Sequence, residues 1–218
     1  MCIRDRFEVS AFADPSGAFT TAAGMLASVE KALQDKFDSD MNGKNVACLG
    51  GTGPVGMAGA VIAAKAGANV TIYGRKKDKS QRVAGVCNAA YGSDEISIAG
   101  DSIDDLDNYL PDVDVILATA SAGIEVLNAE QLQKAVQLKV AADVNAVPPS
   151  GIAGLDVMDN AKVIDGSPSG AVGIGALAIG NVKYQTQNML LKKMCETDKP
   201  IYLHFEHAFT VAREYVNK

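Results

Sequence analysis

Several features that would point to common functions are missing from this sequence. Its four cysteines are scattered without any CxxC spacing, which argues against a disulfide framework or zinc site and favours reduced thiols in a cytoplasmic protein. Apart from residues 75–77 it has no basic cluster, and its formal net charge is −6, so we expect no nucleic-acid partner. The most apolar run, residues 170–182, is too short and too rich in glycine to cross a membrane.

Catalytic constellations are missing as well. His204 and His207 stand one helical turn apart, but no third potential ligand clusters near them, and such a pair is more often a surface feature than a metal site. The sequence shows no Ser/His/Asp or Cys/His arrangement and no well-placed pair of carboxylates. We therefore expect no metal, and the sequence names no acid–base or nucleophilic machinery.

What the sequence does contain is a glycine-rich loop, residues 50–56, with the spacing Gly-x-Gly-x-x-Gly from Gly51 to Gly56. A short apolar stretch precedes it and an alanine-rich stretch follows, so we expect a strand, a tight turn and a helix. In this context the first glycine allows the turn, the second lets the backbone approach a pyrophosphate, and the third lets helix and strand pack closely. Pro54 suits the first helical position, and the positive end of the helix would face the phosphates. The loop therefore predicts dinucleotide binding.

The end of the following strand indicates which dinucleotide is bound. Proteins that bind NAD place an acidic residue about 20 residues after the glycines, where it hydrogen-bonds the ribose 2′-hydroxyl. This sequence has Gly74 there, followed by Arg75, Lys76 and Lys77. Arg75 can bind a 2′-phosphate through two hydrogen bonds, and Lys76 adds a point charge. The spacing favours NADP over NAD; the alternative is an ordinary solvated basic turn that opens a helix.

Strand and helix alternate along most of the chain, which indicates an α/β protein with a Rossmann-type, doubly wound parallel sheet. Ligands of such sheets lie beyond the carboxyl ends of the strands, where the loops 50–56, 118–123 and 143–154 should meet. The expected strands are residues 7–12, 46–49, 70–73, 95–99, 113–118 and 139–142. The expected helices are residues 20–37, 55–66, 78–90, 103–110, 128–135 and 203–216, with another that ends near residue 195.

Two of these loops have compositions that suit a nicotinamide. Small residues around Ala120 would let its ribose lie against the backbone, or they reflect tight packing alone. In residues 143–152, two prolines and Gly151 stiffen a segment that would form a rigid shelf beside the nicotinamide, and Asn145 offers donors and an acceptor to its amide. The alternative is a proline-rich turn. A further segment, residues 170–180, carries glycines that are costly in a helix and are expected where backbone or ligand approaches closely.

Four separated blocks of this sequence together resemble one family, the NADP-dependent methylene-tetrahydromethanopterin dehydrogenases of bacterial one-carbon metabolism. The resemblance runs from about Phe7 to the C-terminus. The blocks are VSAFADPSGAFTTAAG at 9–24, GGTGPVGMAGA at 50–60 with YGRKKDKS at 73–80, ADVNAVPPSGIAGLD at 142–156 and GALAIGNVK at 175–183.

The resemblance implies a two-lobed enzyme in which an α/β lobe precedes the Rossmann lobe and the pterin lies in the cleft between them. By this comparison residues 1–41 are the remnant of the N-terminal lobe and a connecting helix, residues 42–180 the NADP-binding domain, and residues 181–218 helices that pack back toward the N-terminal lobe. Residues 1–6 do not look like a natural start, so we expect a fragment of a longer chain. The turn DPSGAF departs from the family's DxNGSN-like form, so direct polar contacts from Ala18 and Phe19 are not carried over.

The implied reaction is reversible hydride transfer from the methylene carbon of a tetrahydropterin to C4 of NADP⁺, which leaves a methenyl cation. Because the pterin nitrogens stabilise that cation, positioning and electrostatics would carry the catalysis. Lys183 matches the family's lysine that faces the pterin and is the expected catalytic residue, while Asp14 matches its aspartate at the lobe junction. The alternative for Lys183 is an ordinary helix-surface lysine. The cofactor ligands implied are Gly51, Thr52, Gly53, Pro54, Val55 and Gly56 for the pyrophosphate, Arg75 and Lys76 for the 2′-phosphate, and Ala120, Asn145, Pro148, Gly151 and Ile152 beside the nicotinamide.

Three other functions remain open. A methylene-tetrahydrofolate dehydrogenase would act on the same five-membered ring, and only side groups far from the reaction distinguish the two pterins. Another two-lobed dehydrogenase with the same Rossmann lobe, such as one acting on shikimate, would need a Lys–Asp pair from the N-terminal lobe. A catalytically silent NADP-binding module would bind the cofactor tightly without turnover. Enzymes of this type tend to associate, so we expect a homo-oligomer of unspecified size.

Overall fold

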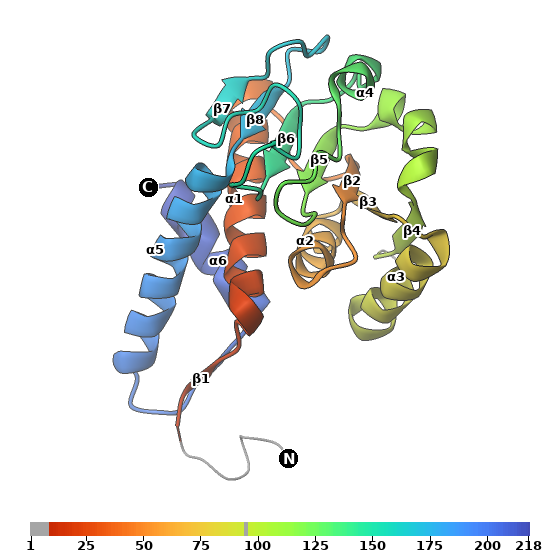
Figure 1. The fold of residues 1–218 in the computed structure, drawn as a ribbon. Helices are drawn as coiled ribbons and strands as arrows, with labels where there is room; N and C mark the ends of the chain where they lie inside the picture. The colour runs from red at the N-terminus through yellow and green to blue at the C-terminus, as the bar shows by residue number, and fades with distance from the viewer. Residues whose placement is uncertain (1–8, 94–95) are drawn as a thin grey trace.

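A seven-stranded sheet forms the centre of the molecule, and the computed structural model describes it within residues 9–93 and 96–218 (Figure 1). Its strand order is β4-β3-β2-β5-β6-β8-β7. Neighbouring strands run parallel except for β7, which is antiparallel to β8. The strands are β2 (Asn45–Leu49), β3 (Asn69–Gly74), β4 (Ile98–Ser102), β5 (Val115–Ala118), β6 (Val140–Asp143), β7 (Asn160–Val163) and β8 (Val172–Ile174).

The sheet is doubly wound, as the sequence predicts. From β2 the chain moves outward through β3 to β4, and it then returns to pair β5 with the other side of β2. The direction of winding therefore reverses between β2 and β5. In open α/β sheets the ligand crevice lies outside the carboxyl ends of the strands at such a reversal.

Helices cover one face of the sheet thickly and the other thinly. On the thick face, α1 packs against α2, α5 and α6, and strand residues such as Val46 and Cys48 point into that cluster. Figure 1 shows α1, α5 and α6 side by side as one bundle. The alternate strand residues, such as Ala47 and Leu49, point to the other face, which short helices and loops cover. The helices are η2 (Pro15–Gly17), α1 (Ala18–Phe37), α2 (Pro54–Lys65), α3 (Lys77–Tyr91), η3 (Ile103–Asn108), η4 (Leu110–Asp112), α4 (Ala129–Lys134), α5 (Ala176–Cys195) and α6 (Phe205–Val216).

Some predicted elements differ from the observed ones. The segment predicted as one helix at 103–110 forms the two 3₁₀ helices η3 and η4, and Pro111 stands in the first turn of η4. The last helix starts at Phe205 rather than at residue 203, because β9 (Tyr202–Leu203) pairs in parallel with β1 (Ala11–Phe12). The strands predicted at 7–12 and 95–99 begin outside the described residues, and β1 and β4 are the parts that the structure describes.

The glycine-rich segment 170–180 contains β8 and the start of α5. A Cβ on Gly173 would lie 3.0 Å from the Leu155 side chain, and one on Gly175 would lie 2.2 Å from the Asp156 carbonyl oxygen. Close backbone approach therefore explains these two glycines. A Cβ on Gly180, in contrast, would meet no atom within 4 Å.

Candidate active site

The glycine-rich loop between β2 and α2 has the geometry that dinucleotide binding requires. A Cβ on Gly56 would come within 2.4 Å of the Gly51 Cα, so the third glycine of the motif is needed where helix and turn pack together. A Cβ on Gly53 would meet no atom within 4 Å, so the second glycine borders open space into which a pyrophosphate fits. No side chain caps α2, which starts at Pro54, and the N–H groups of its first turn (Val55, Gly56) are therefore available to an anion.

The structure brings together the three loops that the sequence places at this edge of the sheet. Gly50 adopts a φ of +69°, and a Cβ on it would lie 2.6 Å from the Ala120 Cα, so the first and second loops are in contact. The N–H of Gly123 donates to Asn145 Oδ1 at 3.1 Å, which joins the second loop to the third.

A cleft of about 880 Å³ opens at the meeting point of β2, β3 and β5. Thr52 and Gly53 from the glycine loop, Ala120 from the loop after β5, and Arg75 and Lys79 from the end of β3 and the start of α3 line it. Its volume suits a cofactor, because small-molecule sites typically span several hundred Å³. Lys76, which the sequence pairs with Arg75, is the N-terminal cap residue of α3 and does not line this cleft.

The position at the end of β3 explains why no acidic residue is found there. A Cβ on Gly74 would lie 2.7 Å from Ser80 Oγ and 2.9 Å from Thr52 Cγ2. Ser80 is buried and its hydroxyl donates to the Lys76 carbonyl. A carboxylate side chain therefore does not fit at residue 74 in this conformation, and a cation just beyond it replaces the usual contact with the ribose.

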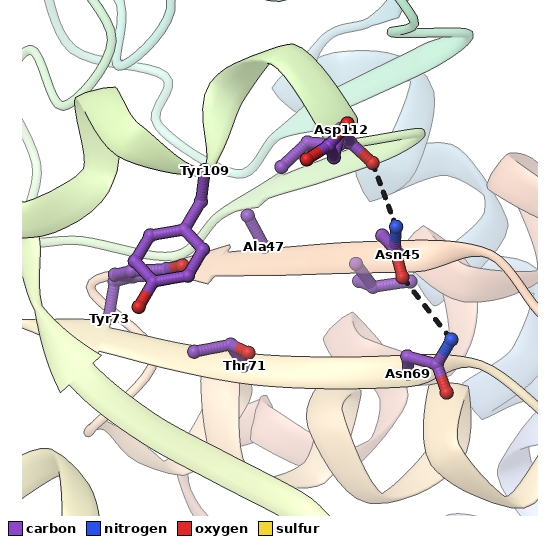
Figure 2. A pocket seen from close by; sticks show the side chains of 9 residues that line it. Asn45, Ala47, Asn69, Thr71, Tyr73, Tyr109 and Asp112 are labelled. Atoms are coloured by element: carbon purple, nitrogen blue, oxygen red, sulfur yellow. Dashed lines mark hydrogen bonds between the residues drawn. The ribbon is translucent and has the colours of Figure 1, made fainter.

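A smaller hollow of about 230 Å³ lies on the thinly covered face of the sheet and shares Tyr73 with the cleft. Figure 2 shows Tyr73 and Tyr109 at one end of it. At the other end Asn45 Nδ2 donates to the Asp112 carbonyl at 2.9 Å, and Asn69 Nδ2 donates to Asn45 Oδ1 at 3.2 Å (Figure 2). These amides hold one another, and none of the predicted site residues lines the hollow.

The loop after β6 is organised around a buried carboxylate, Asp143. Its oxygens accept hydrogen bonds from the N–H of Asn145 at 2.9 Å and of Gly151 at 2.7 Å. Burial raises the pKa of Asp143, and the hydrogen bonds from the main chain oppose that shift. A Cβ on Gly151 would lie 2.8 Å from Asp143 Oδ1, so Gly151 is needed for the main chain to come this close.

The predicted nicotinamide shelf is therefore built mainly by internal bonds. Asn145 Oδ1 accepts from the N–H groups of Gly123 and Val147, and its Nδ2 donates to the Pro149 carbonyl at 2.8 Å. Pro148 is exposed, whereas the Ile152 side chain is fully buried in the core beneath the loop. Any contact between Ile152 and a cofactor must therefore come from its main chain.

The carboxylate of Asp14 lies between the start of α1 and the middle of α5. Its Oδ1 accepts from the N–H of Phe19 at 2.9 Å and of Thr20 at 3.1 Å. Its Oδ2 accepts from the Thr20 hydroxyl at 2.7 Å and from Gln187 Nε2 at 3.1 Å. A carboxylate offers about four lone-pair sites, so these bonds saturate it. We refer to Asp14, Thr20 and Gln187 as the Asp14 cluster.

Lys183 lies one helical turn before Gln187 and reaches the same cluster. A Cβ on Gly24 would lie 3.1 Å from the Lys183 main-chain nitrogen, so α1 and α5 approach closely here. The ammonium extends over Gly17, on which a Cβ would lie 2.7 Å from Lys183 Nζ. Within residues 9–93 and 96–218, this half-buried ammonium has no hydrogen-bond or ion-pair partner. The structure thus brings Asp14 and Lys183 together and leaves the donors of Lys183 available.

Sequence reasoning misses four residues of these sites. Lys79 is hidden among neighbouring cations, and Asp143 stands out only as part of a loop. Thr20 and Gln187 carry no motif of their own, and Gln187 is 173 residues from Asp14. Only the fold reveals these pairings.

The two histidines have a structural arrangement. His204 caps α6 by accepting from the N–H of Glu206, and His207 Nδ1 accepts from the N–H of His204. Among the residues that the structure describes, no three His, Cys, Asp or Glu side chains gather closely enough to hold a metal ion. No helix in the described part of the chain has both the length and the apolar character needed to span a bilayer.

The doubly wound sheet, the glycine loop and the cleft at the switch point define a Rossmann-type dinucleotide-binding protein. No family model matches the chain. It is 43% identical over 204 residues to the NAD(P)-dependent methylenetetrahydromethanopterin dehydrogenase of Methylorubrum extorquens, across 93% of this chain and 68% of that protein. It is 32% identical over 211 residues to the bifunctional protein MdtA of the same organism, across 95% of this chain and 69% of MdtA. The chain belongs to the methylenetetrahydromethanopterin dehydrogenase family.

Solved structures with low sequence identity share the fold. Quinate dehydrogenase from Corynebacterium glutamicum aligns with a TM-score of 0.57 at 11% identity, over 96% of this chain and 72% of that chain. A dipicolinate synthase from Bacillus halodurans aligns through one of its chains with a TM-score of 0.52 at 21% identity, over 85% of this chain and 57% of that chain. This chain therefore spans little more than half of the latter protein, and the likeness concerns the fold alone.

Proposed function

We propose that this protein is an oxidoreductase that transfers a hydride between the methylene group of methylene-tetrahydromethanopterin and NADP. The observation that carries this proposal is the 43% identity, across 93% of the chain, to an enzyme of that name. The cleft at the carboxyl ends of the strands and the free ammonium of Lys183 supply places for the two reactants.

The cofactor fits the residues of the cleft. The main-chain N–H groups of Val55 and Gly56 would hold the pyrophosphate over the open side of Gly53. Arg75 would bind the 2′-phosphate, because it lines the cleft and has no carboxylate partner within the described residues. When bound, NADP⁺ supplies the nicotinamide carbon that accepts the hydride.

Lys183 and Asp14 would act on the pterin in different ways. The Lys183 ammonium has donors to spare, so it would hydrogen-bond a polar group of the pterin and fix its orientation. The Asp14 oxygens already accept four hydrogen bonds, so Asp14 would act through its negative charge and by holding the start of α1 in place. That charge partly offsets the Lys183 ammonium while a cation develops on the substrate.

Two finer points of the proposal concern assembly and location. Leu177, Tyr184 and Leu191 are exposed on α5 at intervals of seven residues, and this apolar stripe supports association into a homo-oligomer. The free cysteines Cys48 and Cys87 support a location in the reducing cytoplasm.

Replacement of Lys183 tests the catalytic assignment. Lys183→Ala should slow hydride transfer by about 10²-fold, because a group that orients the substrate is lost. Its Kd for NADPH, measured by nucleotide fluorescence, should stay within about twofold of the wild type, since Lys183 is not part of the cleft. Lys192→Ala, which removes an exposed lysine from the same helix, is the matched control. An unchanged rate, or a loss of NADPH affinity, would remove Lys183 from the proposed role.

A further inference from the structure

Four cations lie at the end of β3 and in the first turn of α3, and the structure gives them different surroundings. Lys77 is bound: its Nζ lies 2.7 Å from Asp101 Oδ1 and 3.5 Å from Asp105 Oδ2, and these carboxylates raise its pKa. Lys76 is the exposed cap residue of α3 and does not line the cleft. Arg75 and Lys79 both line the cleft.

Arg75 and Lys79 are also free to bind an anion. In the parts of the chain that the structure describes, neither side chain has a hydrogen-bond or ion-pair partner. Lys79 is the third residue of α3, so it stands one turn beyond Arg75 on the same side of the helix start. The buried Ser80 fixes this turn, because its hydroxyl donates to the Lys76 carbonyl.

The helix itself adds to the positive potential at this point. No side chain caps the N-terminus of α3, whose fifteen residues direct the positive end of their dipole toward the turn. Of the acidic residues on the cleft, Asp107 is neutralised by Lys134, 2.5 Å away, and this contact lowers the pKa of Asp107. The two free cations therefore face a cleft in which one acidic side chain is already paired.

We propose that Lys79 is the second ligand of the cofactor 2′-phosphate, beside Arg75, in place of the Lys76 that the sequence suggests. The inference rests on the proposed use of NADP and specifies how that cofactor is distinguished from NAD. Arg75 supplies a planar guanidinium with two parallel donors, and Lys79 supplies a compact charge from a second direction. NAD lacks the phosphate and gains nothing from Lys79, so the residue determines specificity and not binding in general.

The test compares loss of charge at three positions: Lys79→Met, Lys76→Met and, as a control for net charge, Arg82→Met, which removes an exposed cation further along α3. The probes are adenosine 2′,5′-bisphosphate and ADP, titrated by calorimetry, with NADPH and NADH followed by fluorescence. One charge-assisted hydrogen bond corresponds to about a 10- to 100-fold change in Kd. Lys79→Met should raise the Kd for NADPH and for the bisphosphate by that factor and leave ADP and NADH within about twofold.

Further variants separate the inference from the function on which it rests. Lys79→Arg should restore most of the affinity for the bisphosphate, whereas Lys76→Met and Arg82→Met should change it by less than about threefold. A larger effect at Lys76 than at Lys79, or an equal loss of ADP and bisphosphate in Lys79→Met, would overturn the assignment of Lys79 and leave the use of NADP intact. Wild-type protein that binds the bisphosphate no better than ADP would overturn both.

Discussion

Replacing Gly17 with alanine tests whether Lys183 acts from the position that the structure shows. Gly17 has a φ of +71°, and a Cβ on it would lie 2.7 Å from Lys183 Nζ. Ordinary van der Waals contact begins at 3.4 Å, so the ammonium would have to withdraw by about 0.7 Å. Because Nζ ends a flexible side chain, this movement costs little stability, but it displaces the group that would orient the pterin.

The variant also carries a backbone cost, which a second glycine allows us to subtract. An alanine at positive φ costs about 1–2 kcal/mol of stability. Gly43 has a φ of +70°, and a Cβ on it would meet no atom within 4 Å. Gly43→Ala therefore carries the same backbone cost and leaves Lys183 in place. Urea unfolding should give both variants a similar loss in the free energy of unfolding.

Catalysis should separate the two variants. A displacement near 1 Å costs up to about 10²-fold in rate, so we expect hydride transfer to fall by about 10- to 100-fold in Gly17→Ala and by less than about twofold in Gly43→Ala. Stopped-flow absorbance of the reduced nicotinamide measures the step, and fluorescence titration checks that the Kd for NADPH is unchanged. Equal rates in the two variants would refute the reasoning, as would a loss of rate explained wholly by weaker cofactor binding.

The remaining predictions concern the cofactor loop, the 2′-phosphate and α6. Gly53→Ala should leave the melting temperature unchanged but weaken NADPH binding, since its methyl group enters open space beside the pyrophosphate, whereas Gly56→Ala should lower the melting temperature, because its Cβ meets Gly51 at 2.4 Å; equal melting temperatures would contradict this. Arg75→Ala should raise the Kd for NADP far more than that for NAD, and equal effects would remove its assignment. Burial lowers the pKa of His207, and the charge of His204 adds to the shift, so the unfolded chain takes up this proton first and stability should fall as the pH drops below about 6.5. His207→Gln keeps an acceptor for the cap without this titration, and urea unfolding at pH 7.5 and 5.5 should show a smaller pH dependence; an unchanged dependence would refute the role.

The glycine loop could be predicted in detail because its constraints are local. The spacing from Gly51 to Gly56 and the flanking strand and helix fix where the turn, the open side and the close contact must lie. The family could be predicted for the same reason, since its blocks lie in such loops, and the 43% identity to a curated member confirms it.

Spacing could not decide which cations face the cleft. Residues 75–79 carry four of them, and the sequence favours those closest to the end of the strand. In the structure Lys76 becomes the cap of α3 and Lys79 reaches the cleft. A shift of one residue near a helix start turns a side chain by about 100°, so a motif read along the chain cannot supply this choice.

The Asp14 cluster was inaccessible for another reason. Asp14 and Gln187 meet only because α1 packs against α5, and the fold joins segments from the two ends of the chain. Asn145 shows the opposite case: the sequence identifies a polar residue in the right loop, but most of its hydrogen-bonding capacity holds that loop together. Its contact with the nicotinamide stays a prediction, as do the roles of Pro148 and Gly151.

The most direct test of the central claim is the rate of nicotinamide reduction when the protein meets methylene-tetrahydromethanopterin and NADP⁺, run beside methylene-tetrahydrofolate and NAD⁺. The account predicts turnover that is fastest with methylene-tetrahydromethanopterin and NADP⁺. Binding of NADPH without turnover in any of the four pairings would contradict it and indicate a silent cofactor-binding module instead.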